Sequence, residues 1–75
     1  MPPVESPLPP LYAIYDHPSD YPEEFVCRIW YGLEPEQQLF ARGATLEEVR
    51  QRLPLGLVNL GRHKTDDPKV LEVWI

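Results

Sequence analysis

Hydrophobic positions along the chain fall into short runs separated by polar, proline-rich or glycine-rich segments. Residues 11–15 (LYAIY) are apolar and aromatic, which predicts a strand. Residues 24–31 (EFVCRIWY) give the strongest strand pattern, because side chains alternate between the two faces of a strand. The side chains expected on its core face are Phe25, Cys27, Ile29 and Tyr31. Those expected on its opposite face are Val26, Arg28 and Trp30.

The remaining runs predict further extended segments. Residues 32–36 (GLEPE) are typical of a turn and 38–42 (QLFAR) of a returning strand, so the two predict a hairpin with the strand before them. Residues 56–62 (GLVNLGR) are compatible with a short strand or with a packed irregular segment. Residues 70–75 (VLEVWI) predict a final strand, paired with 11–15 or with 25–31. Its core face is expected to carry Leu71, Val73 and Ile75, with Glu72 and Trp74 opposite.

One helix is expected after Thr45. Thr45 and Glu48 form a capping box, in which each side chain satisfies a backbone N–H at the helix start. Leu46, Val49 and Leu53 form a single apolar stripe, and Pro54 ends the helix after about two to three turns. So short a helix is marginal alone in water, so it must pack on the sheet.

These elements predict an α+β domain over residues 11–75, preceded by a proline-rich extended arm over 1–10. The expected order is β-β-β-α-(β)-β, a mainly antiparallel sheet of roughly three to five strands with one helix on one face. The helix stripe would meet Phe25, Cys27, Ile29, Leu71 and Val73. A single helix leaves the second sheet face partly open, and the candidates for an interaction surface there are Val26, Trp30 and Trp74. The alternative is that the arm and the loops cover them.

Composition narrows the classes of function. The chain has 75 residues and a net charge of −5, which fits one domain and argues against nucleic acid or an anionic membrane surface as partner. Cys27 is the single cysteine, so no internal disulfide can form. The sequence shows neither a signal-peptide pattern nor an apolar run of membrane-spanning length, which gives a cytoplasmic location as the default.

Candidate chemistry is sparse, and we expect no enzyme activity and no cofactor. Two carboxylates and an imidazole around residues 16–24 could bind a metal ion, but their neighbouring prolines favour turn chemistry. The residues of that group are Asp16, His17, Asp20, Glu23 and Glu24. Cys27 could pair with His17 or His63 as a nucleophile, but its place on an apolar strand face favours a buried structural role. A weak basic patch, offset by Asp66 and Asp67, consists of Arg62, His63, Lys64 and Lys69.

Three stretches of the chain together resemble a group of short uncharacterised proteins from bacteria and their phages or prophages. They are YDHPSDYPEEFVCRIW, TLEEVRQRLPLGLVNLGR and DDPKVLEVWI, against a group pattern of YDxPxDYPxxFVxRxW, LEEVRxxLPxGL and DDPxxxEVW. The resemblance covers residues 12–75 and implies a phage or mobile-element setting. It implies no activity and no site residues. Cys27 stands where the group more often has Val or Ala.

Two functional hypotheses follow. The first is a non-enzymatic protein-interaction domain of unknown partner, including a homodimer through a sheet edge or face. The second is a small acidic, phage-encoded inhibitor of a host nucleic-acid-binding protein, which requires the acidic residues to form one contiguous face. That face would be built from Asp16, Asp20, Glu23, Glu24, Glu34, Glu36, Asp66 and Asp67.

Overall fold

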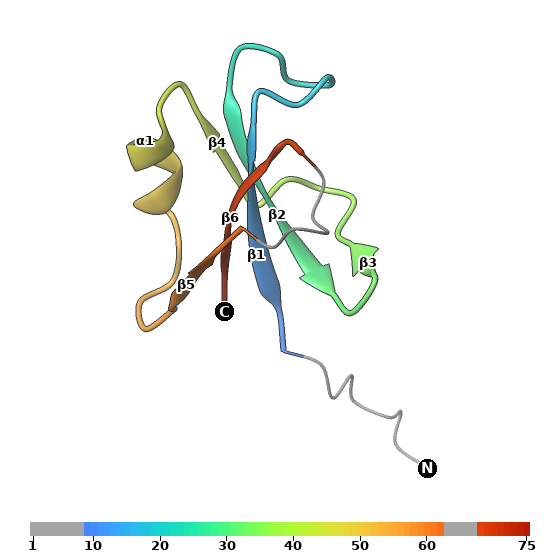
Figure 1. Ribbon diagram of the computed structural model, residues 1–75, viewed down its shortest axis with the longest axis vertical. Coiled ribbons are helices and arrows are strands. Elements are labelled where there is room, and N and C mark those ends of the chain that lie inside the picture. The colour runs from blue at the N-terminus through green and yellow to red at the C-terminus, as the bar shows by residue number, and fades with distance from the viewer. Residues whose placement is uncertain (1–8, 63–67) are drawn as a thin grey trace.

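In the computed structural model, which describes residues 9–62 and 68–75, a mainly antiparallel sheet carries one short helix on one face (Figure 1). This confirms the α+β prediction. The elements are β1 (Leu11–Asp16), β2 (Phe25–Tyr31), β3 (Glu34–Pro35), β4 (Ala41–Gly43), α1 (Leu46–Arg50), β5 (Asn59–Gly61) and β6 (Val70–Trp74). The described sheet has six strands instead of three to five, because the predicted turn at 32–36 contains β3 and the ambiguous segment contains β5. The predicted arm lies outside the described residues except for Pro9 and Pro10.

The longest strands lie at the centre of the sheet. The order is β3-β2-β1-β6-β5; β3 pairs with the last two residues of β2, and β4 pairs with its first three. β6 pairs with β1, which is one of the two partners expected from the sequence. Figure 1 places β5 and β3 on opposite sides of the β1–β2–β6 centre. The sheet therefore has one edge made by β5 and another made by β3 and β4.

Helix α1 is shorter than predicted, although its stripe packs as expected. Thr45 is its N-cap, and the Glu48 N–H donates to Thr45 Oγ1 at 3.2 Å. The helix ends at Arg50 instead of continuing to Leu53, because the N–H of Arg52 donates to the Val49 carbonyl, three residues back in place of four. The Leu53 N–H still donates to the Arg50 carbonyl at 3.1 Å, which keeps the last turn tightly wound. Val49 is fully buried in the core, and Leu46 and Leu53 pack against it.

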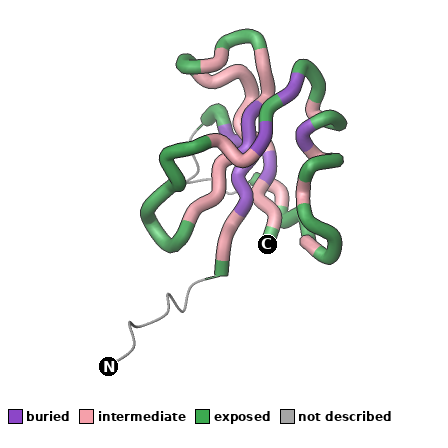
Figure 2. Tube along the Cα trace, turned by 180° about the vertical axis from the view of Figure 1, so that it is seen from behind, coloured by how far each residue is buried: buried purple, intermediate pink, exposed green. Residues whose placement is uncertain are grey.

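The core lies between α1 and the face of the sheet toward it, called here the helix face. Its buried cluster consists of Tyr12, Ile14, Cys27, Ala41 and Val49. Phe25 and Ile29 pack against that cluster, which confirms the predicted core face of β2. Tyr31 is the exception, because it lies at the strand end and is 41% exposed. Figure 2 shows the buried positions gathered where the central strands cross and on the inner side of α1.

The residues of β6 that face the helix are not the ones predicted. Trp74 is directly opposite Tyr12, and Glu72 is opposite Ile14, so both lie on the helix face. The expectation that Leu71 and Val73 meet the helix stripe is therefore wrong; Val73 lies opposite Ala13 on the other face. The alternation of apolar and polar residues predicted that Leu71, Val73 and Ile75 face the helix. Glu72 lies on the helix face instead. It is stabilised in this buried position because the side chains of Arg50, Trp74 and Asn59 form hydrogen bonds to it.

The side of the sheet away from the helix, called here the second face, is also partly buried. Ala13 is 3% and Val26 1% exposed, and Val70 at 5% lies opposite Tyr15. A sheet whose central positions are buried on both faces loses the simple alternation of apolar and polar residues. None of the helical structure in residues 9–62 and 68–75 has the length and hydropathy that crossing a bilayer requires.

Candidate protein-interaction surface

The two tryptophans lie on opposite faces of the sheet. Trp30 is on the second face, where its Nε1 donates to the Tyr15 hydroxyl at 3.1 Å. Trp74 is on the helix face, packed against the core, and its Nε1 donates to Glu72 Oε1 at 3.0 Å. Each indole N–H thus has a partner within the chain. The prediction that Trp74 points away from the core is wrong.

Val26 is 1% exposed, so its side chain is not available to a partner in this structure. It lies on the second face beside Arg42, as its register with β4 shows. The three predicted residues, Val26, Trp30 and Trp74, are therefore not brought together into one surface. Only Trp30 is both on the second face and partly accessible.

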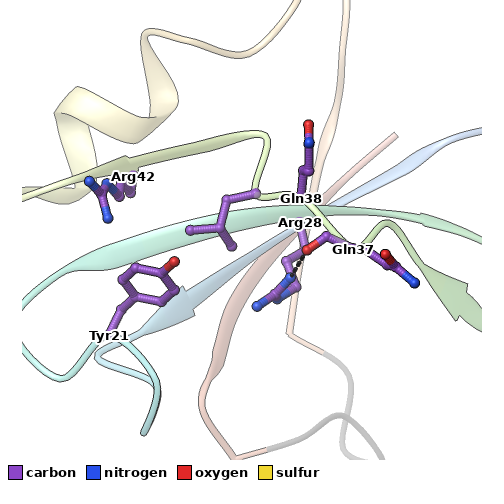
Figure 3. A pocket seen from close by; sticks show the side chains of 6 residues that line it. Tyr21, Arg28, Gln37, Gln38 and Arg42 are labelled. Atoms are coloured by element: carbon purple, nitrogen blue, oxygen red, sulfur yellow. Dashed lines mark hydrogen bonds between the residues drawn. The ribbon is translucent and has the colours of Figure 1, made fainter.

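A polar groove of about 450 Å³ opens on the second face (Figure 3). Its lining residues are Tyr21, Arg28, Gln37, Gln38, Leu39 and Arg42. Arg28 Nη2 donates to Asp20 Oδ2 at 2.9 Å and Nη1 to the Gln37 carbonyl at 3.3 Å. Arg28 thereby fastens two loops to β2, so its charge and donors already have partners in the chain.

Arg42, the second arginine of the groove, is also engaged. Its guanidinium lies 5.5 Å from the centre of the Tyr21 ring, and Nη1 is 3.8 Å from Glu24 Oε1. The groove thus pairs its two cations with Asp20 and Glu24. An anion would have to displace these carboxylates, so the groove is weak as a ligand site.

The acidic residues and histidine of the loop after β1 do not converge. His17 bonds to Asp16 through Nδ1, and its ring packs edge-on against Phe25 with centroids 4.7 Å apart. Asp20 and Glu24 instead face the two arginines of the groove. Within the described ranges, no three His, Cys, Asp or Glu side chains are grouped as metal ligands. Of the weak basic patch, His63 and Lys64 lie outside the described residues.

Cys27 is fully buried in the core cluster. Burial raises the pKa of its thiol to about 12. A nucleophilic cysteine requires a lowered pKa, because the thiolate is the reactive form. The structure therefore assigns Cys27 a packing role.

Exposed apolar side chains gather at the β5 edge. Val58 and Ile75 exchange both backbone hydrogen bonds, at 2.9 and 3.0 Å, so their side chains lie next to each other on one face. Val58 is 59% and Ile75 42% exposed, and Leu60 on β5 is 60% exposed. We call these three residues the β5 patch.

Strand β5 has a free side. Among the strands described, it has a neighbour only in β6. Because Val58 directs its N–H and C=O toward Ile75, alternation directs those of Asn59 away from β6. The β5 edge thus offers backbone hydrogen-bonding groups beside exposed apolar side chains.

Sequence reasoning did not single out the β5 patch. A signal was present, because residues 53–61 (LPLGLVNLG) contain no charged side chain in a chain that is 25% charged. An uncharged apolar segment is equally typical of a buried strand, so only the exposed fractions distinguish the two cases.

The opposite edge of the sheet is protected in the way that natural edge strands are. β3 is two residues long and consists of Glu34 and Pro35, with Glu36 following. β4 places the exposed Arg42 at the same side. Charge, proline and short length all oppose pairing with another chain. β5 is also short, at three residues, and its register with β6 shifts between Asn59 and Gly61, but it carries neither a charged residue nor a proline.

No protein-family model, no curated protein and no solved structure matches this chain.

Proposed function

We propose that this chain is a protein-interaction module that docks its partner on the edge of β5. The observation that carries the proposal is the Val58–Ile75 pair, which is hydrogen-bonded through the backbone yet about half exposed at the side chains. Leu60, on β5 and two residues after Val58, is also exposed. Large apolar side chains that are exposed beside an unpaired strand edge favour association with other chains, and a bound partner would cover them.

Strand addition is the binding mode that fits this edge. A partner strand placed beside β5 would bond to the outward N–H and C=O of Asn59 and cover the β5 patch. The backbone bonds would give orientation, and burial of the patch would supply most of the free energy, at about 25 cal/mol per Å² of apolar surface.

The test is a photo-crosslinking amino acid at position 60, in cells that express the chain from its own gene. The matched control carries the same probe at Leu33, which is 94% exposed and lies at the protected edge beside Glu34. The expected result is a covalent adduct from position 60 and none from position 33. Absence of any adduct from position 60, or equal adducts from both positions, would contradict the proposal.

The acidic-inhibitor hypothesis stays a prediction that no observation favours. It requires a contiguous acidic face, whereas Asp20 and Glu24, two members of that face, each lie within ion-pair distance of an arginine. Asp66 and Asp67, which the hypothesis also uses, lie outside the described residues.

A further inference from the structure

We infer that the partner at the β5 edge is a second copy of this chain, paired antiparallel through β5 about a two-fold axis. The inference rests on the proposed function and adds the identity of the partner. It depends on the distribution of charge along the two sheet edges and on the geometry of β5.

Charge is the first argument. Two copies of a chain with net charge −5 repel each other, so a self-contact is least opposed where acidic groups are absent from it. The segment 53–61 meets this condition, because none of its side chains is charged. The protected edge does not, since self-pairing there would bring Glu34 and Glu36 of each copy together.

Symmetry is the second argument. An antiparallel strand pair about a two-fold axis places the same surface on both sides, so one edge suffices to make a self-complementary contact. The outward backbone of Asn59 would meet the same strand of the second copy, and the β5 patch would meet its own equivalent. A charged foreign partner would find no group of opposite charge in segment 53–61 to recognise.

The blocked second edge of the sheet limits the assembly to two copies. Each copy has one apolar edge at β5, and its other edge is blocked by Glu34, Pro35 and Arg42. Pairing therefore stops at a dimer and does not continue into a filament. Because β5 has only three residues, the contact is small, and we expect a dissociation constant in the roughly micromolar range typical of transient interfaces.

Sedimentation equilibrium over a wide concentration range tests the inference. The wild-type chain is expected to form a dimer, and Leu60→Asp to weaken it by about tenfold or more, since a carboxylate would be desolvated in the contact. The matched control is Leu33→Asp, which adds the same charge at the protected edge and should dimerise like the wild type. Dimerisation that persists unchanged in Leu60→Asp would overturn the inference.

Salt dependence provides an independent measurement. Screening reduces the repulsion between two copies of net charge −5, so higher salt should tighten the dimer. A dimer that weakens with salt would mean that opposite charges form the contact, which contradicts an uncharged edge.

The mass of the photo-adduct separates the two proposals. An adduct of twice the chain's mass from position 60 supports both. A monomeric wild type, together with an adduct of another mass, overturns the second copy and leaves the interaction module standing. A monomeric wild type with no adduct overturns both.

Discussion

Arg50 Nε donates to Glu72 Oε1 at 3.0 Å, and this bond joins α1 to β6 across the helix face. The two residues are 22 positions apart in the sequence, and Arg50 Nη2 bonds to the other Glu72 oxygen. Glu72 also accepts from the Trp74 indole N–H. In a domain of 75 residues, whose core is small, one satisfied buried carboxylate has a large share in fixing where the helix lies.

Replacing Glu72 by Gln should lower the free energy of unfolding by about 1–3 kcal/mol, because hydrogen bonds to charged groups in the interior are lost. Urea unfolding measures the change. The matched control is Glu47→Gln, which removes an exposed contact of 3.5 Å to the same Arg50 and should cost less than about 0.5 kcal/mol. Equal losses of unfolding free energy in the two variants would contradict the proposed stabilising role of the Arg50–Glu72 pair.

The same carboxylate predicts a pH dependence. The Arg50 hydrogen bond, followed by that of Trp74, holds the pKa of Glu72 below its ordinary value. A carboxyl with a depressed pKa in the folded state stabilises the fold above the unfolded-state pKa of about 4.3, and this contribution is lost as pH falls through the folded pKa. The stability difference between wild type and Glu72→Gln should therefore be constant near neutral pH and shrink below about pH 4.3. If the difference in unfolding free energy between wild type and Glu72→Gln stayed constant down to the folded-state pKa of Glu72, then the Glu72 carboxylate would not be the stabilising group.

Cys27 should be unreactive while the chain is folded. Its thiol is fully buried, and burial raises its pKa to about 12, so thiolate is scarce at neutral pH. A thiol reagent at pH 7 should label the native chain only at the rate of unfolding, and the chain in denaturant at the ordinary rate of a free cysteine. Fast labelling of the native chain would show that the core opens at this strand.

The helix cap gives a further stability test. Thr45→Ala removes the acceptor of the Glu48 N–H and should cost about 1 kcal/mol, which is a fall in melting temperature of about 4–8 °C for a domain of this size. Thr45→Ser keeps the hydroxyl and is the matched control, with a smaller loss. An alanine variant as stable as the serine variant would mean that the cap does not stabilise α1.

Local signals in the sequence determined the types of α1 and of the three longest strands, and the side chains that α1 contributes to the core. The capping box at Thr45 and the stripe through Val49 act within a few residues, so they predict the helix without knowledge of its surroundings. The strong alternation around Cys27 likewise identified the core face of β2. Two details of these elements were wrong: α1 is shorter because its last turn tightens to bonds three residues back, and Tyr31 of β2 is exposed at the strand end.

The tertiary structure alone decided the faces of β6 and the location of the candidate surface. β6 carries apolar residues on both faces, so alternation could not choose between them; the choice came from Arg50, a distant cation that makes a buried Glu72 favourable. The uncharged segment around Leu60 could equally have been a buried strand. Its position at the end of the sheet leaves it exposed, since strand order depends on long-range pairing that no local pattern encodes.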